Sequence, residues 1–318
     1  MKVTVVIPAY CRPQELKRAL EALTRQDCQA DEVIVVARKD DAGTHEAAKE
    51  FLAALPLKLE FVERPGMVEA VNRGLDTATG DLIALTDDDA APHPDWIAKI
   101  AKAFSDEPDL AGLGGRDRIF QDGAWNEAAA RVVGVVCRYG RMFGNHHHGV
   151  GPMRDVDSLK GVNMSCRREA LDKLRMDHRL RGTGAQCHCD LKLCLSLRAQ
   201  GKRLAYDPSI LVDHFPAPRY DEDQRGVFNA LAYENQIHNV TLALLEYLGP
   251  AARMLLLPYA ILIGVENGYC GLLKGLLYCP IIGFRQARQK TIASARGVCA
   301  AWKTWKVSRR RSVKGENR

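Results

Sequence analysis

The stretch that decides the fold is Asp81-Leu82-Ile83-Ala84-Leu85-Thr86-Asp87-Asp88-Asp89. Its first six residues form a largely apolar run typical of a buried strand, and three aspartates follow at once. Adjacent carboxylates repel one another, so a positive partner normally compensates them. A divalent cation is such a partner, and hydrated Mg²⁺ or Mn²⁺ bridges readily to a diphosphate. A solvated acidic turn is the alternative, and the triplet alone does not decide between the two.

Strands and helices alternate up to this stretch. The predicted strands are short apolar runs, and the predicted helices carry apolar residues at helical spacing. In chain order these elements are Val3–Ile7, Pro13–Leu23, Glu32–Val36, His45–Ala54, Leu57–Val62, Met67–Asp76 and Asp81–Thr86. The alternation predicts an α/β fold, with a Rossmann-like, mostly parallel sheet and helices on both of its faces. Ligands of such sheets bind outside the carboxyl ends of the strands, where the aspartates lie.

The middle of the chain is less regular. Glycine and proline surround His146, His147 and His148, and this composition predicts a mobile loop over Arg141–Ser158. Ordered structure is expected to resume at Gly161–Cys166. The other predicted elements are strands over Leu113–Phe120, Arg203–Tyr206 and Ile210–Val212 and a helix over Asp190–Ala199.

Charge and hydropathy change over the last part of the chain. Arg285–Arg318 carries eleven Lys or Arg against one acid, whereas the first 284 residues have 34 basic and 38 acidic side chains. Met254–Val265 and Gly275–Phe284 are uncharged, and Pro258, Glu266 and Pro280 interrupt the region. An interfacial or re-entrant helical hairpin fits at least as well as a spanning helix. A buried helix pair packed on the rest of the protein is the plainer alternative.

The basic tail points to a polyanionic partner, either nucleic acid or an anionic bilayer. Because Trp302 and Trp305 and the apolar segments are adjacent, we expect a membrane surface and no nucleic acid. The sequence opens on a predicted strand without a secretory signal, so we expect reduced thiols and a location on the cytoplasmic face of a membrane. Cys187-His188-Cys189 with Cys194 has poor spacing for a zinc ribbon, and we treat zinc as a minor alternative.

Several blocks resemble, in the expected order, the family 2 glycosyltransferases, which have the nucleotide-binding GT-A fold. The blocks are Val5–Pro13, Asn72–Leu75, Ala78–Asp81, Leu85–Asp89 and Gly161–Arg167. The first block departs from the family at Cys11, where asparagine is usual. The resemblance covers residues 1–220, which we take as a GT-A catalytic domain followed by a helical, apolar and basic region over residues 221–318. It is the combination of blocks that is specific.

The resemblance implies a donor site and a metal site. Asp87 and Asp89 match the two carboxylates of the family's DXD motif, and His214 matches a histidine that often completes the metal site, here with Mn²⁺ or Mg²⁺. After the second strand, where relatives carry an acidic turn that contacts the base, Asp40 or Asp41 is a substitute, and Arg38 is an alternative contact for phosphate. The implied donor-binding residues are Pro8, Ala9, Tyr10, Arg12, Asp40, Asn72, Asp87 and Asp88.

The resemblance also implies a catalytic base and an acceptor side. Asp190 matches one acid of the family's base motif, whereas Cys189 and Lys192 stand where two further acids are usual. An aspartate at a helix start is also a common cap. As base, Asp190 would take the proton of the acceptor hydroxyl, and direct displacement implies inversion. The implied acceptor-side residues are Gly161, Asn163 and Met164.

Together these patterns predict an inverting, metal-dependent glycosyltransferase that moves a sugar from a nucleotide-sugar to a hydroxyl. The acceptor is expected to be a saccharide or lipid-linked, in cell-surface polysaccharide or glycolipid synthesis. The altered base motif leaves open an inactive, membrane-attached sugar-binding or scaffold protein. A sugar nucleotidyltransferase is less well supported, because Pro8–Pro13 lacks the glycines of a triphosphate loop.

Overall fold

The computed structural model describes residues 1–265 and 270–313, with side chains as far as Arg310. Glu266 and the charges of residues 314–318, which entered the expectations above, lie outside these ranges. The predicted alternation is confirmed, because strands and helices follow one another up to the acidic triplet. The elements are β1 (Val3–Ala9), α1 (Pro13–Thr24), β2 (Glu32–Arg38), α2 (Ala42–Lys49), β3 (Leu57–Val62), α3 (Met67–Thr77) and β4 (Leu82–Leu85).

Helix α2 differs from its prediction at both ends. It begins at Ala42, three residues earlier than expected, because the Asp41 carboxylate accepts hydrogen bonds from the Thr44 amide at 3.2 Å and the Thr44 hydroxyl at 2.5 Å. Such a cap satisfies a backbone donor at the start of a helix. The helix ends at Lys49, and a short turn leads on to β3.

One mixed sheet runs through the molecule in the order β10-β12-β6-β11-β4-β1-β2-β3. Strands β4, β1, β2 and β3 are parallel, as are β6 and β12, and β11 is antiparallel between the two groups. The remaining strands are β5 (Ala90–Pro92), β6 (Leu110–Gln121), β7 (Ala124–Trp125), β10 (Arg154–Asp155), β11 (Met164–Arg167) and β12 (Arg203–His214). The two short strands predicted at Arg203–Tyr206 and Ile210–Val212 are one strand, which an irregularity between Asp207 and Leu211 divides.

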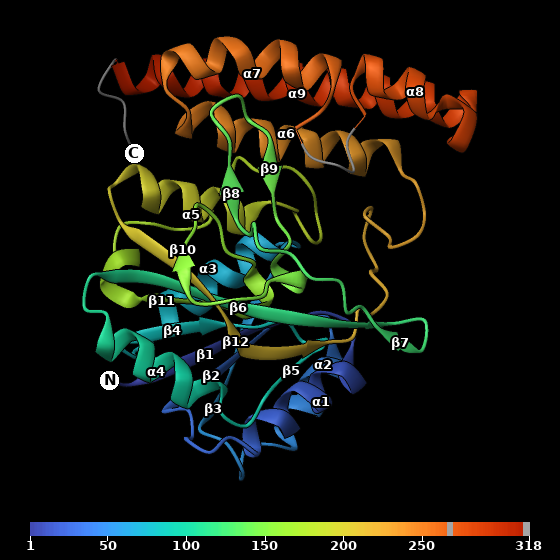
Figure 1. Cartoon of the computed structure of the whole chain (residues 1–318). Coiled ribbons are helices and arrows are strands. Elements are labelled where there is room, and N and C mark those ends of the chain that lie inside the picture. Colours follow the sequence, from blue (N-terminus) through green and yellow to red (C-terminus); the bar gives the residue numbers. More distant parts are fainter. Residues whose placement is uncertain (266–269, 314–318) are drawn as a thin grey trace.

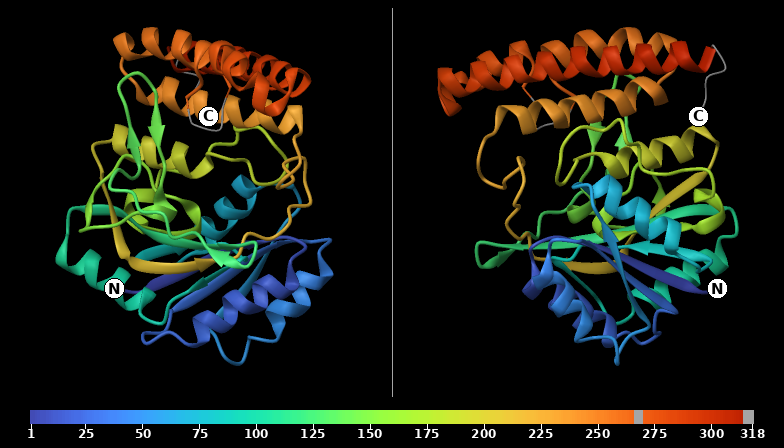
Figure 2. Two further views of the ribbon diagram at one scale, coloured as in Figure 1. Left: turned by 45° about the vertical axis from the view of Figure 1, so that its right-hand side comes forward. Right: turned by 180° about the vertical axis from the view of Figure 1, so that it is seen from behind.

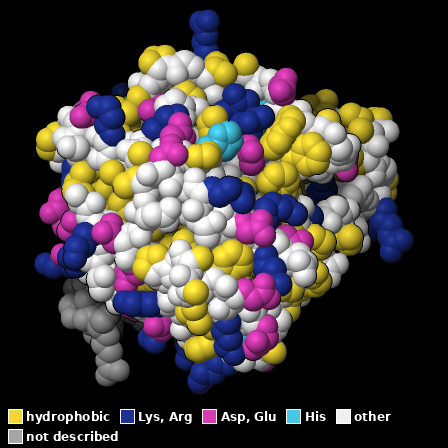
Figure 3. Space-filling model, turned by 90° about the horizontal axis from the view of Figure 1, so that it is seen from below, with side chains coloured by type: hydrophobic (Ala, Val, Ile, Leu, Met, Phe, Trp, Pro, Cys, Tyr) yellow, Lys and Arg dark blue, Asp and Glu magenta, His cyan; other side chains and the backbone are white. Residues whose placement is uncertain are grey.

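Apolar side chains fill both faces of the sheet. Alternate residues of β1 point to opposite sides, so that Val5 and Ile7 pack with α1, α2 and α4 (Trp96–Asp106), while Val6 packs on the side of α3 and α5 (Cys189–Ala199). Figure 1 shows α1, α2 and α4 below the sheet and α3 and α5 above it. The surface seen from below carries acidic and basic side chains interspersed with small apolar areas (Figure 3).

Four helices form a separate layer beyond α5, which we call the C-terminal platform (Figures 1 and 2). They are α6 (Ala230–Tyr247), α7 (Pro250–Leu262), α8 (Leu272–Ile282) and α9 (Phe284–Val313). Helix α6 is largely buried and joins the core of α3 and α5, so the platform and the sheet share one apolar core. Trp305, expected at a membrane surface, is 8% exposed and belongs to this core, because α9 packs it toward the body of the protein.

The segment predicted as a mobile loop, Arg141–Ser158, is mostly irregular, with two strands of two residues and a 3₁₀ turn, and its mobility stays a prediction. A short hairpin of β8 (Val135–Val136) and β9 (Met142–Phe143) rises from the sheet to the platform, where the Met142 amide donates to the Val265 carbonyl at 3.1 Å. A 3₁₀ turn, η1 (His146–His148), follows it. His146 is buried and hydrogen-bonded to the Ser158 carbonyl at 2.9 Å, which holds the two ends of the segment together.

Among the described residues no helix combines the length and the apolar character needed to cross a bilayer.

Candidate functional site

The acidic triplet lies at the carboxyl end of β4, between β1 and β11. The Asp88 and Asp89 side chains are 0% and 1% exposed, whereas Asp87 is partly exposed. The Phe215 amide donates to the Asp89 carbonyl at 2.9 Å, which ties the end of β12 to the triplet. The solvated acidic turn is therefore excluded, because two of the three carboxylates are inside the protein.

Two arginines compensate the buried carboxylates. Arg12, from the loop after β1, contacts Asp88 at 2.8 Å and Asp89 at 3.0 Å. Arg225 contacts the same Asp89 oxygen at 3.0 Å from the segment that follows β12. Burial raises the pKa of Asp88 well above its usual range, against the attraction of Arg12. For Asp89 burial acts in the same direction, but His214, Arg12 and Arg225 outweigh it and lower its pKa, so Asp89 is a carboxylate.

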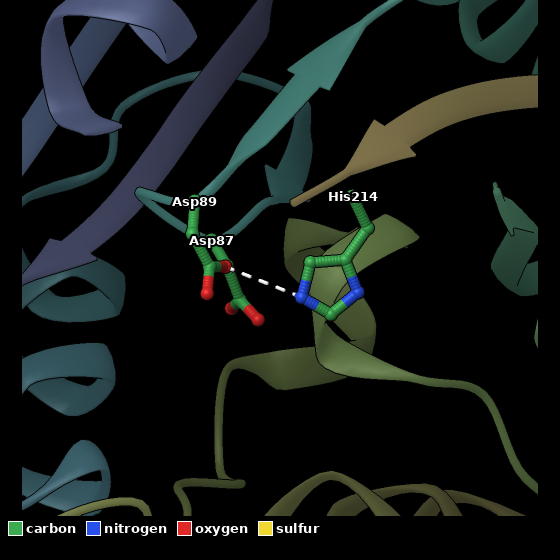
Figure 4. A group of neighbouring side chains, drawn as sticks. All are labelled: Asp87, Asp89 and His214. Atoms are coloured by element: carbon green, nitrogen blue, oxygen red, sulfur yellow. Dashed lines mark ion pairs between the residues drawn. The ribbon is translucent and has the colours of Figure 1, made fainter. Parts of the chain in front are cut away.

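Asp87, Asp89 and His214 converge at the strand ends, as Figure 4 shows. One ligand atom from each residue lies within 4.8 Å of the others. His214 Nε2 is 3.3 Å from Asp89 Oδ1, and neither buried atom has a hydrogen-bond partner among the described residues. Buried polar atoms without partners are costly unless a ligand satisfies them. Two carboxylates and an imidazole suit Mn²⁺ or Mg²⁺, so this donor set fits a divalent cation.

Asp117 contacts His214 and is itself paired with Lys160, and neither residue was predicted from the sequence. His214 Nδ1 lies 3.4 Å from Asp117 Oδ2, and the Lys160 ammonium contacts that same oxygen. Burial acts to lower the pKa of His214, but Asp117 and Asp89 outweigh it and the pKa is raised. A carboxylate on one ring nitrogen fixes the tautomer that presents the other nitrogen to a metal. Asp117 therefore orients His214.

A cavity of about 380 Å³ opens on one side of the triplet. Pro8, Ala9, Tyr10 and Arg12, all predicted from the resemblance, line it together with Asp87 and Asp89. Arg38 also lines it, and its guanidinium lies 4.6 Å from the centre of the Tyr10 ring. This wall combines an aromatic face, two arginines and carboxylates, which suits a nucleotide with a diphosphate. We call it the donor cavity.

A second cavity, of about 350 Å³, adjoins the first. Asp190, at the start of α5, lines it, and its Oδ2 accepts a hydrogen bond from the Gly161 amide at 3.0 Å. Gly161, Lys160 and His147 also line this space; burial and then Lys160 lower the pKa of His147 to about 4. We call it the acceptor cavity. Five residues border both cavities, namely Pro8, Met67, Asp87, Ala185 and Arg219.

Three predicted site residues have structural contacts and border neither cavity. Asn72 is buried and exchanges hydrogen bonds with the backbone of Met176 at 2.8 and 2.9 Å. Asn163 accepts from the Trp96 indole at 2.9 Å and donates to the Ile210 carbonyl at 3.0 Å. Met164 is fully buried in β11. Asn72 lies in α3, Asn163 ends the 3₁₀ turn before β11 and Met164 begins that strand, so all three serve the packing and do not face the cavities.

Two predicted aspartates also lie outside the donor cavity lining. Asp88 faces Arg12 inside the protein and holds the first loop in place. Asp40 is 64% exposed and pairs with Arg38 at 2.5 Å. Of the alternatives after the second strand, Asp41 is the helix cap of α2 and accepts from the Cys11 amide at 2.5 Å. Arg38 is the member of this group that reaches the cavity.

The two positions where the base motif lacks acids are integrated into the packing. Cys189 is buried, and Lys192, 10% exposed, contacts Glu246 of α6 at 2.8 Å. Arg179 bridges Asp177 at 2.5 Å and Glu246 at 2.8 Å, so these four charges tie α5 to the platform. Among residues 1–265 and 270–313 the metal-type cluster is Asp87, Asp89 and His214, and the cysteines near position 187 form none.

Arg219 and Arg225 were also missed by the sequence reading. Both lie in the irregular segment after β12 and line the donor cavity. Arg219 contacts Asp223 at 2.5 Å and borders the acceptor cavity as well. The available signal was the presence of two arginines within eleven residues of His214.

Comparisons with known proteins agree with this geometry. Residues 4–175 match the family described as Glycosyl transferase family 2. The uncharacterised glycosyltransferase YfnE of Bacillus subtilis is 34% identical over 116 residues, which are 36% of this chain and 30% of the relative. A glucosyl-dolichyl phosphate glucuronosyltransferase of Haloferax volcanii is 25% identical over 67% of this chain and 69% of its own length. The first two curated relatives are matched over about a third of their length.

Solved structures show the same fold at low sequence identity. S. aureus TarS 1–349 in complex with UDP-GlcNAc is 16% identical, with a TM-score of 0.59 over 96% of this chain and 92% of that one. The mannosyltransferase PcManGT from Pyrobaculum calidifontis, in complex with GDP-Man and Mn²⁺, is 20% identical, with a TM-score of 0.55 over 95% and 86%. The predicted GT-A-like α/β fold is thus confirmed. The family match covers more than half of the chain, across the first loop, the acidic triplet and β11, and the protein is a member of glycosyl transferase family 2.

Proposed function

We propose that the protein is a glycosyltransferase that moves a sugar from a nucleotide-sugar donor to a hydroxyl acceptor, with inversion and with a divalent metal. The observation that carries this proposal is the meeting of two cavities at Asp87. One has the chemistry for a nucleoside diphosphate, and the other presents the Asp190 carboxylate. Two substrates bound side by side meet the geometric requirement of a direct displacement.

Residues of the donor side bind and orient the nucleotide-sugar. Tyr10 and Arg38 offer a stacked face for the base, and Arg12, Arg219 and Arg225 surround the space beside Asp89 with positive charge. Asp87, Asp89 and His214 would hold the metal, which when bound supplies Lewis-acid neutralisation of the diphosphate leaving group. Arg225 contacts Asp89 and lines the donor cavity, so its guanidinium would offer positive charge to the diphosphate.

Asp190 is the proposed base on the acceptor side. The Gly161 amide fixes one carboxylate oxygen at 3.0 Å, and the Leu191 amide contacts the other at 2.7 Å. These contacts orient the carboxylate within the acceptor cavity, where it takes the proton of the attacking hydroxyl. Since the nucleophile is the acceptor oxygen itself, one displacement inverts the anomeric centre. Of the two positions that lack acids, Lys192 pairs with Glu246 away from this cavity and Cys189 borders it, so Asp190 is the carboxylate of the motif that is left for this step.

We further propose a saccharide or lipid-linked acceptor in cell-surface polysaccharide or glycolipid synthesis at the cytoplasmic face of a membrane. The support is the apolar and basic surface of the platform. One relative, in Haloferax volcanii, is named glucosyl-dolichyl phosphate glucuronosyltransferase, and another, in Pyrococcus furiosus, dolichol-phosphate mannosyltransferase.

A panel of nucleotide-sugars tests the proposal. Binding is measured by calorimetry with Mn²⁺, with Mg²⁺ and with a chelator, for the wild type and for Asp89→Ala. We expect one donor to bind in a metal-dependent way, and that binding to be lost in Asp89→Ala. Asp213→Asn is the matched control, because Asp213 faces His93 at 3.1 Å and not the triplet. Failure of every donor under all conditions would favour the inactive scaffold protein.

A further inference from the structure

The outer helices of the platform expose an unusual amount of apolar surface. Of 22 large apolar side chains that are exposed among the described residues, twelve lie between Met254 and Phe284. The most exposed are Met254, Leu277, Ile281 and Phe284, at 78%, 75%, 77% and 72%. Soluble monomers rarely expose contiguous apolar areas of this kind unless they bind something there. We call this surface of α7 and α8 the apolar ridge.

Helix α9 carries a line of positive charge next to the ridge. Its exposed cations include six that are three, four, seven or eight positions apart, namely Arg285, Arg288, Arg296, Lys303, Lys306 and Arg310. This spacing places them on one side of a helix. None of the six is ion-paired with a residue in the described part of the chain. We call them the basic stripe.

The basic stripe points away from the body of the protein. The opposite side of α9 is buried through Ala287, Val298 and Ala301, and at Gly297 a Cβ atom would lie 2.7 Å from the Glu234 carbonyl of α6. Figures 1 and 2 place α9 on the side of α6 that is remote from the sheet. Helices α8 and α9 touch at Gly275, where a Cβ would clash with the Thr291 hydroxyl. The ridge and the stripe are therefore neighbours.

We propose that the apolar ridge and the basic stripe dock the enzyme on an anionic lipid bilayer, with α7, α8 and α9 lying flat in the interface. The proposal deepens the membrane location proposed above and rests on it, but not on the catalytic assignments. Apolar side chains enter the boundary of headgroups and acyl chains, while arginine and lysine meet lipid phosphates. Charge complementarity selects this occupant over a second copy of the chain, because two basic stripes would repel each other.

Co-sedimentation of the full chain with vesicles tests the docking. We expect vesicles that contain phosphatidylglycerol to bind the protein at least about tenfold more tightly than vesicles of phosphatidylcholine alone. Raising the ionic strength from about 0.1 M to about 1 M shortens the Debye length to about 3 Å and should remove most of that preference. Equal binding to both vesicles, or binding to neither, overturns the proposal, as does a dimer in light scattering that buries the ridge.

Two variants separate the contributions of the basic stripe and the apolar ridge to vesicle binding. Arg288→Glu/Arg296→Glu/Lys303→Glu should lose the phosphatidylglycerol preference, and Leu276→Asp/Leu277→Asp should lose binding to both vesicles. The matched controls lie at the end of the molecule opposite the platform. For the stripe variant the control is Arg25→Glu/Lys39→Glu/Lys49→Glu, which replaces cations that are 62%, 61% and 55% exposed. For the ridge variant the control is Leu52→Asp, which replaces an apolar residue that is 54% exposed. Unchanged vesicle binding in the stripe variant contradicts the proposal.

Donor binding, measured on the same preparations, shows whether each variant is folded. It also keeps the two proposals apart. Absence of vesicle binding with intact donor binding refutes the docking alone, and vesicle binding without any donor refutes the proposed transferase alone.

Discussion

The acidic site and the platform depart from ordinary burial in opposite ways. At the acidic site, after β4 and within β6, the protein buries charge, with Asp88, Asp89 and Asp117 at most 1% exposed. On α8 it exposes leucines, while six exposed cations of α9 form no ion pair with the described residues. Buried carboxylates and exposed apolar surface both cost free energy in water unless a ligand compensates them. The comparison supports our two proposals, in which each region is completed by something outside the chain: a cation and donor in one case and a lipid surface in the other.

The largest effect should come from Asp190→Asn. The variant removes the proposed base while it keeps the shape of the side chain, so we expect transfer to fall by about 10²- to 10⁴-fold. Metal and donor should bind as in the wild type, because Asp190 borders the acceptor cavity and not the donor cavity. Steady-state transfer with the identified donor measures the first quantity and calorimetry the second. Unchanged turnover would remove Asp190 from the mechanism.

Asp117→Asn tests the support of the metal site. The amide no longer holds the His214 ring as a carboxylate does, so we expect affinity for Mn²⁺ to fall by about 10- to 100-fold. The neighbour Asp213→Asn, on the other face of β12, should leave it unchanged. Titration of Mn²⁺ by calorimetry compares the two variants. Equal affinities would show that the convergence at His214 has no part in metal binding.

Glu246→Gln tests the link between the two regions. Removing this carboxylate leaves Lys192, 10% exposed, with Asp177 at 3.8 Å, so we expect a loss of about 1 to 3 kcal/mol in the free energy of unfolding. Asp106→Asn, in a pair whose members are 75% and 56% exposed, should cost less than about 1 kcal/mol. Urea unfolding of both variants measures the difference. A single transition would also show that the sheet and the platform unfold together.

The same variant has a predicted pH dependence. Burial acts to raise the pKa of Glu246, but Arg179 and Lys192 outweigh it and lower the pKa. A group whose pKa is lower in the folded state stabilises the protein above its unfolded pKa and ceases to do so as the pH falls through the folded value. The difference between wild type and Glu246→Gln should therefore be constant near neutral pH and shrink below about pH 4. A difference independent of pH would assign the effect to packing.

The smallest effect should come from Arg38→Ala. Its guanidinium stacks on Tyr10 at 4.6 Å in a half-exposed wall of the donor cavity, and such contacts are worth about 0.5 to 1 kcal/mol. We expect donor affinity to fall by about two- to fivefold. Lys39→Ala is the control, since Lys39 is 61% exposed and pairs with Glu63 away from the cavity lining. Equal effects in the two variants would indicate a general change of charge.

The sequence predicted the parts of the site that local order determines. Alternation of strands and helices placed the triplet at a strand end, and the same logic placed Pro8–Arg12 beside it. Asp117 could not be found in this way, because it approaches His214 only through the register of β6 and β12, in which it lies opposite Val212. The contacts of Asn163 and Asn72 with distant backbone depend on the same tertiary pairing. Whether Asp40 or Asp41 faced the donor depended on one turn, and Arg38 reached the cavity instead.

In the platform the composition indicated apolar helices and a basic end but not their orientation. Trp305 shows the difficulty, because a tryptophan among cations suits a headgroup layer as well as it suits a core. Only the packing of α9 on α6 determines which residues of the helix face outward. The base motif was a similar case, since the acid positions at Cys189 and Lys192 gained contacts with α6 that no local pattern reveals.

A crystal structure with Mn²⁺ and the bound nucleotide-sugar tests the central claim most directly. The account predicts an anomalous manganese signal between Asp87, Asp89 and His214, with the diphosphate in the donor cavity and the sugar pointing past Asp87 toward Asp190. A manganese ion at another site would contradict it. So would a nucleotide bound away from Tyr10 and Arg12 with no metal ion at Asp87, Asp89 and His214.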